Sequence, residues 1–284
     1  MRLQWKAALV LLAQKGHRLL LHALLLVAAA LTLAPLVWMC VASLMPAGEA
    51  SQLPPRWWPS RVTAEHYRTL FASLHLGRNF FNSFFLATAA TGLSLFCNSL
   101  AGYALAKLRF VGRDRVFLFL LALLVVPAQV GMLPLFLILR SFGWIDTYWG
   151  VLVPSLASVF GIFLVRQYAQ SIPDGLLDAA RVDGASELRV FWSVGLPLCR
   201  PILVTLGVFT FLGTWNDFLW PLIVLSDAKK QTLPVALASL AAEHIQETEL
   251  MMASAVLTML PAVALFLAVQ RAYVAGIVSG ALKF

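Results

Sequence analysis

Eight of the 34 charged side chains of this 284-residue sequence lie in one segment, residues 166–200. Four basic and four acidic residues occur there: Arg166, Arg181, Arg189 and Arg200, and Asp174, Asp178, Asp183 and Glu187. Carboxylates spaced four or five residues apart suit charge-assisted hydrogen bonds with basic groups of a partner. The segment is therefore a candidate docking surface, and a solvated amphipathic loop is the alternative.

Known catalytic and metal-binding motifs are missing from the sequence. It has no GxxxxGK[ST] phosphate-binding loop, no GxSxG nucleophile elbow and no HExxH pair. Cys40, Cys97 and Cys199 are isolated and lack CxxC spacing. We expect a chain that is not an enzyme, with no catalytic residue, no metal and no cofactor of its own.

A second group of chemically useful residues lies inside apolar runs. Gln129 is surrounded by Pro127, Gly131 and Pro134, so we expect a broken helix there, as in many transport sites. An acidic residue within a membrane span is a functional candidate by default. The candidate translocation residues are Gln129, Asn216, Asp217, Ser155, Ser158 and Thr258. The alternatives are a kinked packing helix at Gln129, an interface anchor at Asp217, and helix packing for the hydroxyl residues.

Composition indicates a membrane protein. Hydrophobic residues make up 61% of the chain and charged residues only 12%, whereas soluble domains carry about 25% charged residues. The 21 Lys and Arg residues exceed the 13 Asp and Glu residues. Because the basic residues lie between apolar runs, they indicate membrane topology, and we expect no nucleic-acid partner.

Six apolar runs predict an all-α fold with six transmembrane helices. Most are near or above the roughly 20 residues that a spanning helix needs, and the fourth is shorter. The runs are 19–44, 80–108, 117–139, 148–165, 201–225 and 251–269. The first run follows a basic stretch, as in a signal peptide, but it is too long for a usual signal core. We expect it to remain as the first span.

Basic residues predict the orientation of the spans. With the N-terminus inside, 14 Lys and Arg residues lie in cytoplasmic segments and 7 lie outside, which places both termini in the cytoplasm. The expected divisions are a cytoplasmic N-terminus (1–18), a first helix with an outer loop (19–79), a permease domain (80–276) and a cytoplasmic tail (277–284). The permease domain includes a cytoplasmic loop, residues 169–200, between helices four and five.

This loop is expected to form a helix, a turn and a second helix. Ser171 is a possible N-cap, followed by Pro173 in the first turn and an acidic residue that complements the helix dipole. Gly184 is expected to end the first helix and Ser186 to cap the second. Such a pair of helices on the inner face is a suitable docking element.

The residues of this loop resemble the EAA loop of ABC importer permeases. Residues 178–186 (DAARVDGAS) and 194–197 (VGLP) follow the pattern E-A-A-x-x-D-G-A and then I-x-L-P. Further stretches, among them 102–110 (GYALAKLRF) and 215–222 (WNDFLWPL), are similar to the second permease of carbohydrate importers, the maltose-permease-G-like type. Asp178 stands where that family usually has Glu, which shortens the reach of the carboxylate.

The resemblance implies a set of partners and a mechanism. The chain would pair with a second permease, two ATPase subunits and an extracytoplasmic sugar-binding protein in the bacterial cytoplasmic (inner) membrane. ATP and magnesium would be used by the ATPase subunits. The docking residues implied are Asp178, Ala179, Ala180, Asp183, Gly184 and Ala185. The sequence does not specify the sugar.

A self-sufficient secondary transporter or channel is the alternative function. Such a protein would need intramembrane acids and inverted repeats. Only Asp217 is an acidic residue within a predicted span, and the six runs show no inverted pairing. The leading prediction is therefore a permease subunit driven by separate ATPases.

Overall fold

The computed structural model describes residues 2–52, 54, 56–243 and 247–281. All regular elements in these ranges are helices, which confirms the predicted all-α class. Met1 and the last three residues of the expected C-terminal tail lie outside the described part of the chain. The chain forms two compact units, which are described separately.

Unit 1 comprises residues 1–73 and 244–257. It contains α1 (Arg2–Ala42), α2 (Glu65–Arg68), the π-helix η1 (Thr69–Ser73) and the first turns of α14 (Thr248–Ala281). Its small core consists of Ala42, Met45 and Ala50, with Met252 packed against them. The helical stretch His17–Ala42 has the length and hydropathy of a membrane span, as predicted for 19–44. Most of its apolar side chains are exposed, which suits a helix whose solvent is lipid.

Unit 2 comprises residues 74–243 and 258–284, and it is built around α3 (Leu76–Lys107). This helix packs most extensively against α7 (Val159–Gln170) and α11 (Arg200–Trp215). At Gly102 an added Cβ would lie 2.7 Å from the Val165 Cβ. Glycine at this position is therefore what lets α3 and α7 approach closely.

Two of the predicted spans are bent. Run 117–139 consists of α4 (Arg113–Leu123), the 3₁₀ helix η2 (Ala128–Gly131) and α5 (Met132–Ser141), with a bend of 97° at the break. The break beside Gln129 was predicted and is confirmed. Run 201–225 is interrupted without being one of the sharply bent pairs, because α11 ends at Trp215 and α12 covers only Leu219–Val224. The second sharply bent pair lies just before and within this run, where Glu187–Leu198 meets Arg200–Trp215 at 77°.

The other spans are not sharply bent, although residues 156–158 separate two helices within one of them. Tyr148–Gln170 contains α6 (Tyr148–Ser155) and α7, and Thr248–Gln270 belongs to α14. In the described chain, four helices have the length and hydropathy to cross a membrane, and six do if each bent pair counts as one span. The six-span topology therefore stays a prediction.

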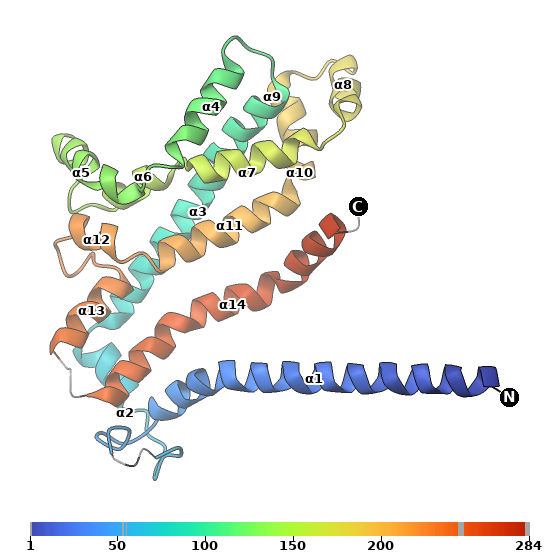
Figure 1. Ribbon diagram of the computed structural model, residues 1–284. Coiled ribbons are helices and arrows are strands. Elements are labelled where there is room, and N and C mark those ends of the chain that lie inside the picture. Colours follow the sequence, from blue (N-terminus) through green and yellow to red (C-terminus); the bar gives the residue numbers. More distant parts are fainter. Residues whose placement is uncertain (1, 53, 55, 244–246, 282–284) are drawn as a thin grey trace. The chain divides into compact units, whose positions relative to one another are not determined.

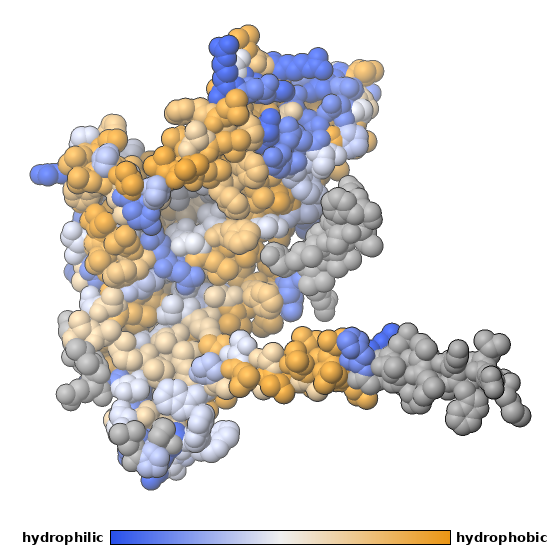
Figure 2. Space-filling view, viewed as in Figure 1, coloured by the Kyte–Doolittle hydropathy of each residue, from blue (hydrophilic) through white to orange (hydrophobic). Residues whose placement is uncertain are grey.

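The remaining short elements of unit 2 lie at the two ends of α3 (Figure 1). One end carries α8 (Asp174–Val182), α9 (Glu187–Val190), the π-helix η3 (Phe191–Gly195) and α10 (Leu196–Leu198). The other end carries α12 and α13 (Leu233–Glu243). Figure 2 shows hydrophilic residues gathered over the end with α8 and apolar residues over the helical shafts of this unit.

Candidate coupling site

The first helix of the charged loop begins two residues later than predicted. Ser171 is the C-terminal cap of α7, and its hydroxyl donates to the Tyr168 carbonyl at 2.7 Å. Pro173, with φ −60° and ψ 130°, is the N-cap of α8, and Asp174 is its first residue. The prediction that Ser171 caps this helix is wrong, because the extended conformation of Pro173 separates Ser171 from the new helix.

The end of α8 was predicted correctly. Gly184 has φ +83°, a left-handed conformation that favours glycine. The Gly184 N–H donates to the Arg181 carbonyl and the Ala185 N–H to the Ala180 carbonyl, both at 3.0 Å. These two bonds form a Schellman motif, which satisfies carbonyls at the helix end. Ser186 then caps α9 by accepting from the Arg189 N–H, as predicted.

Arg181 joins α8 to α9. Its guanidinium donates to Asp178 Oδ1 at 2.6 Å and to both carboxylate oxygens of Glu187, at 2.7 and 3.1 Å. The hydrogen bonds that Arg181 donates to Glu187 and then to Asp178 raise the pKa of Arg181 above its ordinary value. The charged residues that the sequence singled out therefore hold the turn between the two helices in one shape.

The inward face of the loop packs on α3. Leu177 and Val190 are fully buried and form a cluster with Tyr103 and Phe191, whose rings lie 5.1 Å apart. Two of the predicted docking residues, Ala180 and Ala185, are half-buried against this cluster. We call Tyr103, Leu177, Val190 and Phe191 the α3 socket.

The outward face of the loop is exposed and partly apolar. Leu176, Val182 and Leu188 are 51%, 87% and 62% exposed, and the predicted docking residues Asp178, Ala179, Asp183 and Gly184 are exposed beside them. Sequence reasoning had not singled out the three large apolar side chains. Their signal was present, since they are apolar residues in a polar loop. Exposed apolar patches of this kind mark protein contact sites.

A direct link also joins α3 to the start of α8. The Lys107 ammonium donates to the Ile172 carbonyl and to Asp174 Oδ1, each at 2.6 Å. The hydrogen bond and the charge of Lys107 hold the pKa of the Asp174 carboxyl below its ordinary value. Lys107 had no assigned role in the sequence beyond its place in the resembling stretch 102–110.

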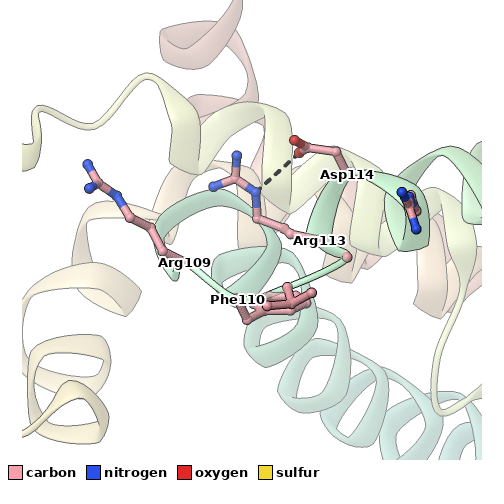
Figure 3. A pocket seen from close by; sticks show the side chains of 7 residues that line it. Arg109, Phe110, Arg113 and Asp114 are labelled. Carbon is pink, nitrogen blue, oxygen red and sulfur yellow. Dashed lines mark hydrogen bonds and ion pairs between the residues drawn. The ribbon is translucent and has the colours of Figure 1, made fainter.

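The turn between α3 and α4 forms a basic concavity next to this link. Residues 109–115 line a cavity of about 490 Å³. In Figure 3 the guanidinium groups of Arg109 and Arg113 extend away from Phe110, and Arg113 pairs with Asp114 at 3.2 Å. A larger polar cleft of about 880 Å³ runs from this turn to Asp174, Asp178, Arg181 and Glu187.

The predicted translocation residues are spread over four segments of unit 2. Gln129 is exposed in η2, and Asn216 is exposed at the C-terminal cap of α11, where it donates to the Leu212 carbonyl at 2.9 Å. Asp217 follows it and accepts from the Trp220 N–H at 3.4 Å. Gln129 and Asn216 therefore present amide groups at helix breaks, where backbone and side chain are open to a ligand.

The hydroxyl residues of the same set have local partners. Ser155 donates to the Leu152 carbonyl at 2.7 Å, and Ser158 caps α7 by accepting from the Gly161 N–H at 2.9 Å. The Thr258 carbonyl accepts from the Trp215 indole at 2.9 Å, which ties α14 to α11. The contact of Thr258 fits the alternative of packing between helices that the sequence left open, whereas Ser155 bonds within its own helix and Ser158 caps one.

Buried asparagines of α3 were missed by sequence reasoning. Asn79 and Asn82 donate to the carbonyls of Ala228, Lys229 and Gln231, and Tyr148 donates to Asn82 Oδ1 at 2.8 Å. Asn98 accepts from the Ser158 N–H at 3.0 Å. Amide side chains at the start of and within a long apolar run are the signal that could have found them, because polar residues in such runs need hydrogen-bond partners.

Asp146 and Lys230 link two loops at the end of α3 opposite α8. The Lys230 ammonium donates to Asp146 Oδ2 and to the Asp146 carbonyl, each at 2.8 Å. The hydrogen bond from Lys230, followed by the one from the Asp227 N–H, lowers the pKa of the Asp146 carboxyl. Within the described residues no group of three or more His, Cys, Asp or Glu could hold a metal ion.

Comparisons with known proteins identify the family. The family model described as "Binding-protein-dependent transport system inner membrane component" matches residues 98–279. The match runs from the last turns of α3 into α14, so it includes the loop between α7 and α11. It confirms that this loop belongs to a permease of that family.

Curated relatives cover most of the chain. An arabinooligosaccharide transport permease of Halalkalibacterium halodurans is 37% identical over 79% of this chain and 81% of its own. An sn-glycerol-3-phosphate transport permease of Yersinia enterocolitica is 33% identical over 93% and 97%. A lactose transport permease of Rhizobium radiobacter is 34% identical over 90% and 93%.

A solved structure has the same fold. A chain of a bacterial ABC transporter involved in the import of the acidic polysaccharide alginate matches with a TM-score of 0.79 and 26% identity, over 91% of this chain and 97% of that one. The chain belongs to the family of binding-protein-dependent transport system inner membrane components, and it is a non-catalytic permease subunit of an ABC importer in a bacterial inner membrane.

Proposed function

We propose that this permease imports a sugar or related carbohydrate and that α8 couples it to a separate ATPase. The names of the relatives support the substrate class, since they transport arabinooligosaccharides and lactose, and the relative that transports sn-glycerol-3-phosphate takes a polyol derivative. Family membership speaks against the alternative of a self-sufficient secondary transporter or channel.

The outward face of α8 and α9 is the proposed contact with the ATPase. It combines exposed Leu176, Val182 and Leu188 with the small residue Ala179, which allows a partner to approach closely. Asp178 and Asp183 are exposed next to them and offer carboxylates to basic groups. The observation that carries the proposal is an exposed apolar face on a loop whose other face is fixed to α3.

The complete transporter would contain a second, different permease, two ATPase subunits that use ATP and magnesium, and an extracytoplasmic binding protein. Both termini would lie in the cytoplasm, on the side of α8. Gln129, Asn216 and Asp217 would line the sugar path at the helix breaks, because amide and carboxylate groups provide the hydrogen bonds that sugar hydroxyls need. Ser155, Ser158 and Thr258 would add hydroxyl groups to the same path.

A pull-down of the ATPase with variants of the permease pair tests the docking face. Val182→Asp puts a charge at an apolar position of α8 that is 87% exposed, and we expect ATPase capture to fall about tenfold or more, because a few residues carry most of the binding energy of an interface. The matched control is Val62→Asp, the same change at a 69% exposed valine of the predicted outer loop. Equal capture by both variants would refute the assignment of the face.

The substrate class is tested with the complete complex in proteoliposomes. A panel of labelled sugars, oligosaccharides and sugar phosphates is offered with the matching binding protein, and ATP-dependent uptake is measured. We expect uptake of at least one carbohydrate and a fall in its rate with Asn216→Ala. Uptake restricted to peptides or inorganic ions would contradict the proposed class.

A further inference from the structure

Two residues of α3 meet two residues of α8. Tyr103 and Lys107 lie four positions apart on α3, so they share one helix face. Leu177 and Asp174 lie three positions apart on α8 and also share a face. Tyr103 packs with Leu177 in the α3 socket, and Lys107 pairs with Asp174. The contact therefore has an apolar point and an ionic point one helical turn apart.

In the ion pair of Lys107 and Asp174, the lysine side chain is buried and the aspartate side chain is exposed. The Lys107 side chain is 6% exposed, whereas the Asp174 side chain is 74% exposed. A buried ammonium needs its hydrogen-bond partners, because leaving it unpaired is strongly unfavourable. Lys107 donates to the last backbone carbonyl before Pro173 as well as to Asp174, so both bonds hold the first turn of α8.

Other charges near Asp174 do not replace Lys107. Arg109 and Arg181 also favour the ionised carboxylate, but Lys107 is the group that hydrogen-bonds to it. Arg181 is committed to Asp178 and Glu187. Arg113 pairs with Asp114 and also donates to the Leu108 carbonyl at 3.5 Å.

The same end of α3 is fixed to α7 from the other side. Gly102 packs against Val165, and Arg166 Nε donates to the Leu105 carbonyl at 3.3 Å. The Arg166 guanidinium also lies 3.6 Å from the centre of the Phe117 ring of α4. Residues 102–107 thus hold α8 on one side and two helices of the permease core on the other.

We propose that Lys107 is the positioning residue that transmits movement of α8 to the helices of unit 2, with Tyr103 as the second point of the contact. Hydrogen bonds of 2.6 Å break when their atoms separate by about an ångström. Intact bonds therefore oblige α8 and the end of α3 to move together. The inference rests on the proposed coupling of α8 to an ATPase, and it adds the residue that relays the motion inward.

The test compares transport with ATP hydrolysis in the complete complex. Lys107→Met keeps most of the apolar stem and removes the ammonium. We expect ATPase capture like the parent, because the outward face of α8 is unchanged. The ratio of sugar molecules imported to ATP hydrolysed should fall about fivefold or more, the range of typical coupling between sites. Lys107→Arg should restore most of the ratio, since it keeps a donor and a charge.

Asp174 provides a variant that does not threaten folding. Asp174→Asn changes an exposed side chain, and Lys107 keeps the Ile172 carbonyl, so its ratio should fall less than that of Lys107→Met. The double variant should match Lys107→Met, because without the Lys107 ammonium the charge of Asp174 has no partner there to lose.

The outcomes separate the two proposals. A merely structural role would lower complex yield, transport and hydrolysis together and leave the ratio at the parental value, which would overturn the proposal for Lys107. Additive losses in the double variant would also overturn it. If the parent chain itself fails to capture an ATPase, the proposed function falls, and this inference falls with it.

Discussion

At the scale of single residues, Arg181 changes what can be expected of Asp178. The carboxylate that the sequence assigned to a partner already accepts from Arg181 at 2.6 Å, yet its side chain remains 61% exposed. An exposed pair three residues apart on a helix contributes only about 0.2–0.5 kcal/mol to folding. The side chain therefore remains open to a second basic group from a partner.

Asp178→Ala tests whether Asp178 contacts a basic group of the ATPase in addition to Arg181. We expect weaker capture of the ATPase at low salt, with a smaller difference from the parent at high salt, because salt screens charge pairs. Asp178→Glu should retain capture, since it keeps the charge that the family usually carries there. Glu187→Gln is the matched control, because it weakens the ion pair between Arg181 and Glu187 and leaves Asp178 unchanged. Similar losses in both would assign the effect to Arg181 and not to a contact with the partner.

Tyr103 carries a polar atom that finds no partner among the described residues. Its hydroxyl is buried without a hydrogen bond, inside the socket that holds α8. Burying such a group costs about 1–3 kcal/mol. The residue therefore contributes through its ring and not through its hydroxyl.

Tyr103→Phe should leave the permease as stable as the parent or raise its Tm by a few degrees, about 2–4 °C per kcal/mol. Tyr103→Ala should lower the unfolding free energy by about 3–5 kcal/mol, because it leaves a cavity against Leu177 and Phe191. Thermal unfolding of the purified permease measures both. A Phe variant as unstable as the Ala variant would show that the hydroxyl does have a partner.

At the scale of elements, short helices are positioned by their ends. α8 has nine residues and would be marginal alone. It is held by Lys107 at its start, by Leu177 in its middle and by the Schellman motif at its end. Each anchor leaves the outward face free for a partner.

Gly184→Val tests the end of α8. The space around Gly184 is open, so the penalty comes from φ +83° alone and should be about 1 kcal/mol or more. We expect normal membrane insertion with reduced ATPase capture or uncoupled hydrolysis. Gly175→Ala is the control, since that glycine is also open but has no left-handed backbone. Normal sugar uptake by Gly184→Val would refute the role of this turn.

The ion pair of Asp146 and Lys230 gives a prediction about pH. Because the folded-state pKa of Asp146 is lowered, its stabilising effect is complete above the unfolded pKa, about 3.9, and is lost as pH falls below it. Asp146→Asn keeps a residue that tolerates its φ of 58°. The decrease in Tm caused by the substitution should therefore be equal at pH 8 and pH 5 and shrink below about pH 4. A decrease that varies between pH 8 and pH 5 would contradict this.

At the scale of the whole molecule, the distribution of charge sets the direction in which the spans run. The basic turn 107–115 and the loop with α8 lie at one end of α3, and the loop of Asp146 and Lys230 lies at the other. Positive residues favour the cytoplasmic side. The charge distribution therefore predicts that the proposed coupling site lies inside and the Asp146 loop outside.

Reporter fusions test the topology. Fusions after Arg56, Arg113, Asp146, Glu187 and Glu243 should report outside, inside, outside, inside and outside. A cytoplasmic signal after Glu243 would contradict the six-span topology, because it would place the segment before α14 on the wrong side.

The sequence by itself determined the class of the molecule and the location of the proposed coupling site. Apolar runs predicted the helices because lipid leaves few alternatives for the backbone. Gly184 and Ser186 predicted the ends of α8 and α9, and Pro127 and Gly131 predicted the break beside Gln129, because these signals act over a few neighbouring residues. The prediction that Ser171 caps α8 is wrong, because Ser171 ends α7 and the extended backbone of Pro173 begins α8.

Only the tertiary structure decided which side chains of the coupling loop face inward. The alternation of apolar and polar residues in α8 does not say that Leu177 meets Tyr103, some seventy residues earlier, or that Lys107 reaches Asp174. The buried asparagines of α3 likewise find their partners in loops about 150 residues away. Such pairs depend on how the helices pack, and helix packing follows from close contacts such as that of Gly102 with Val165, which no local pattern records.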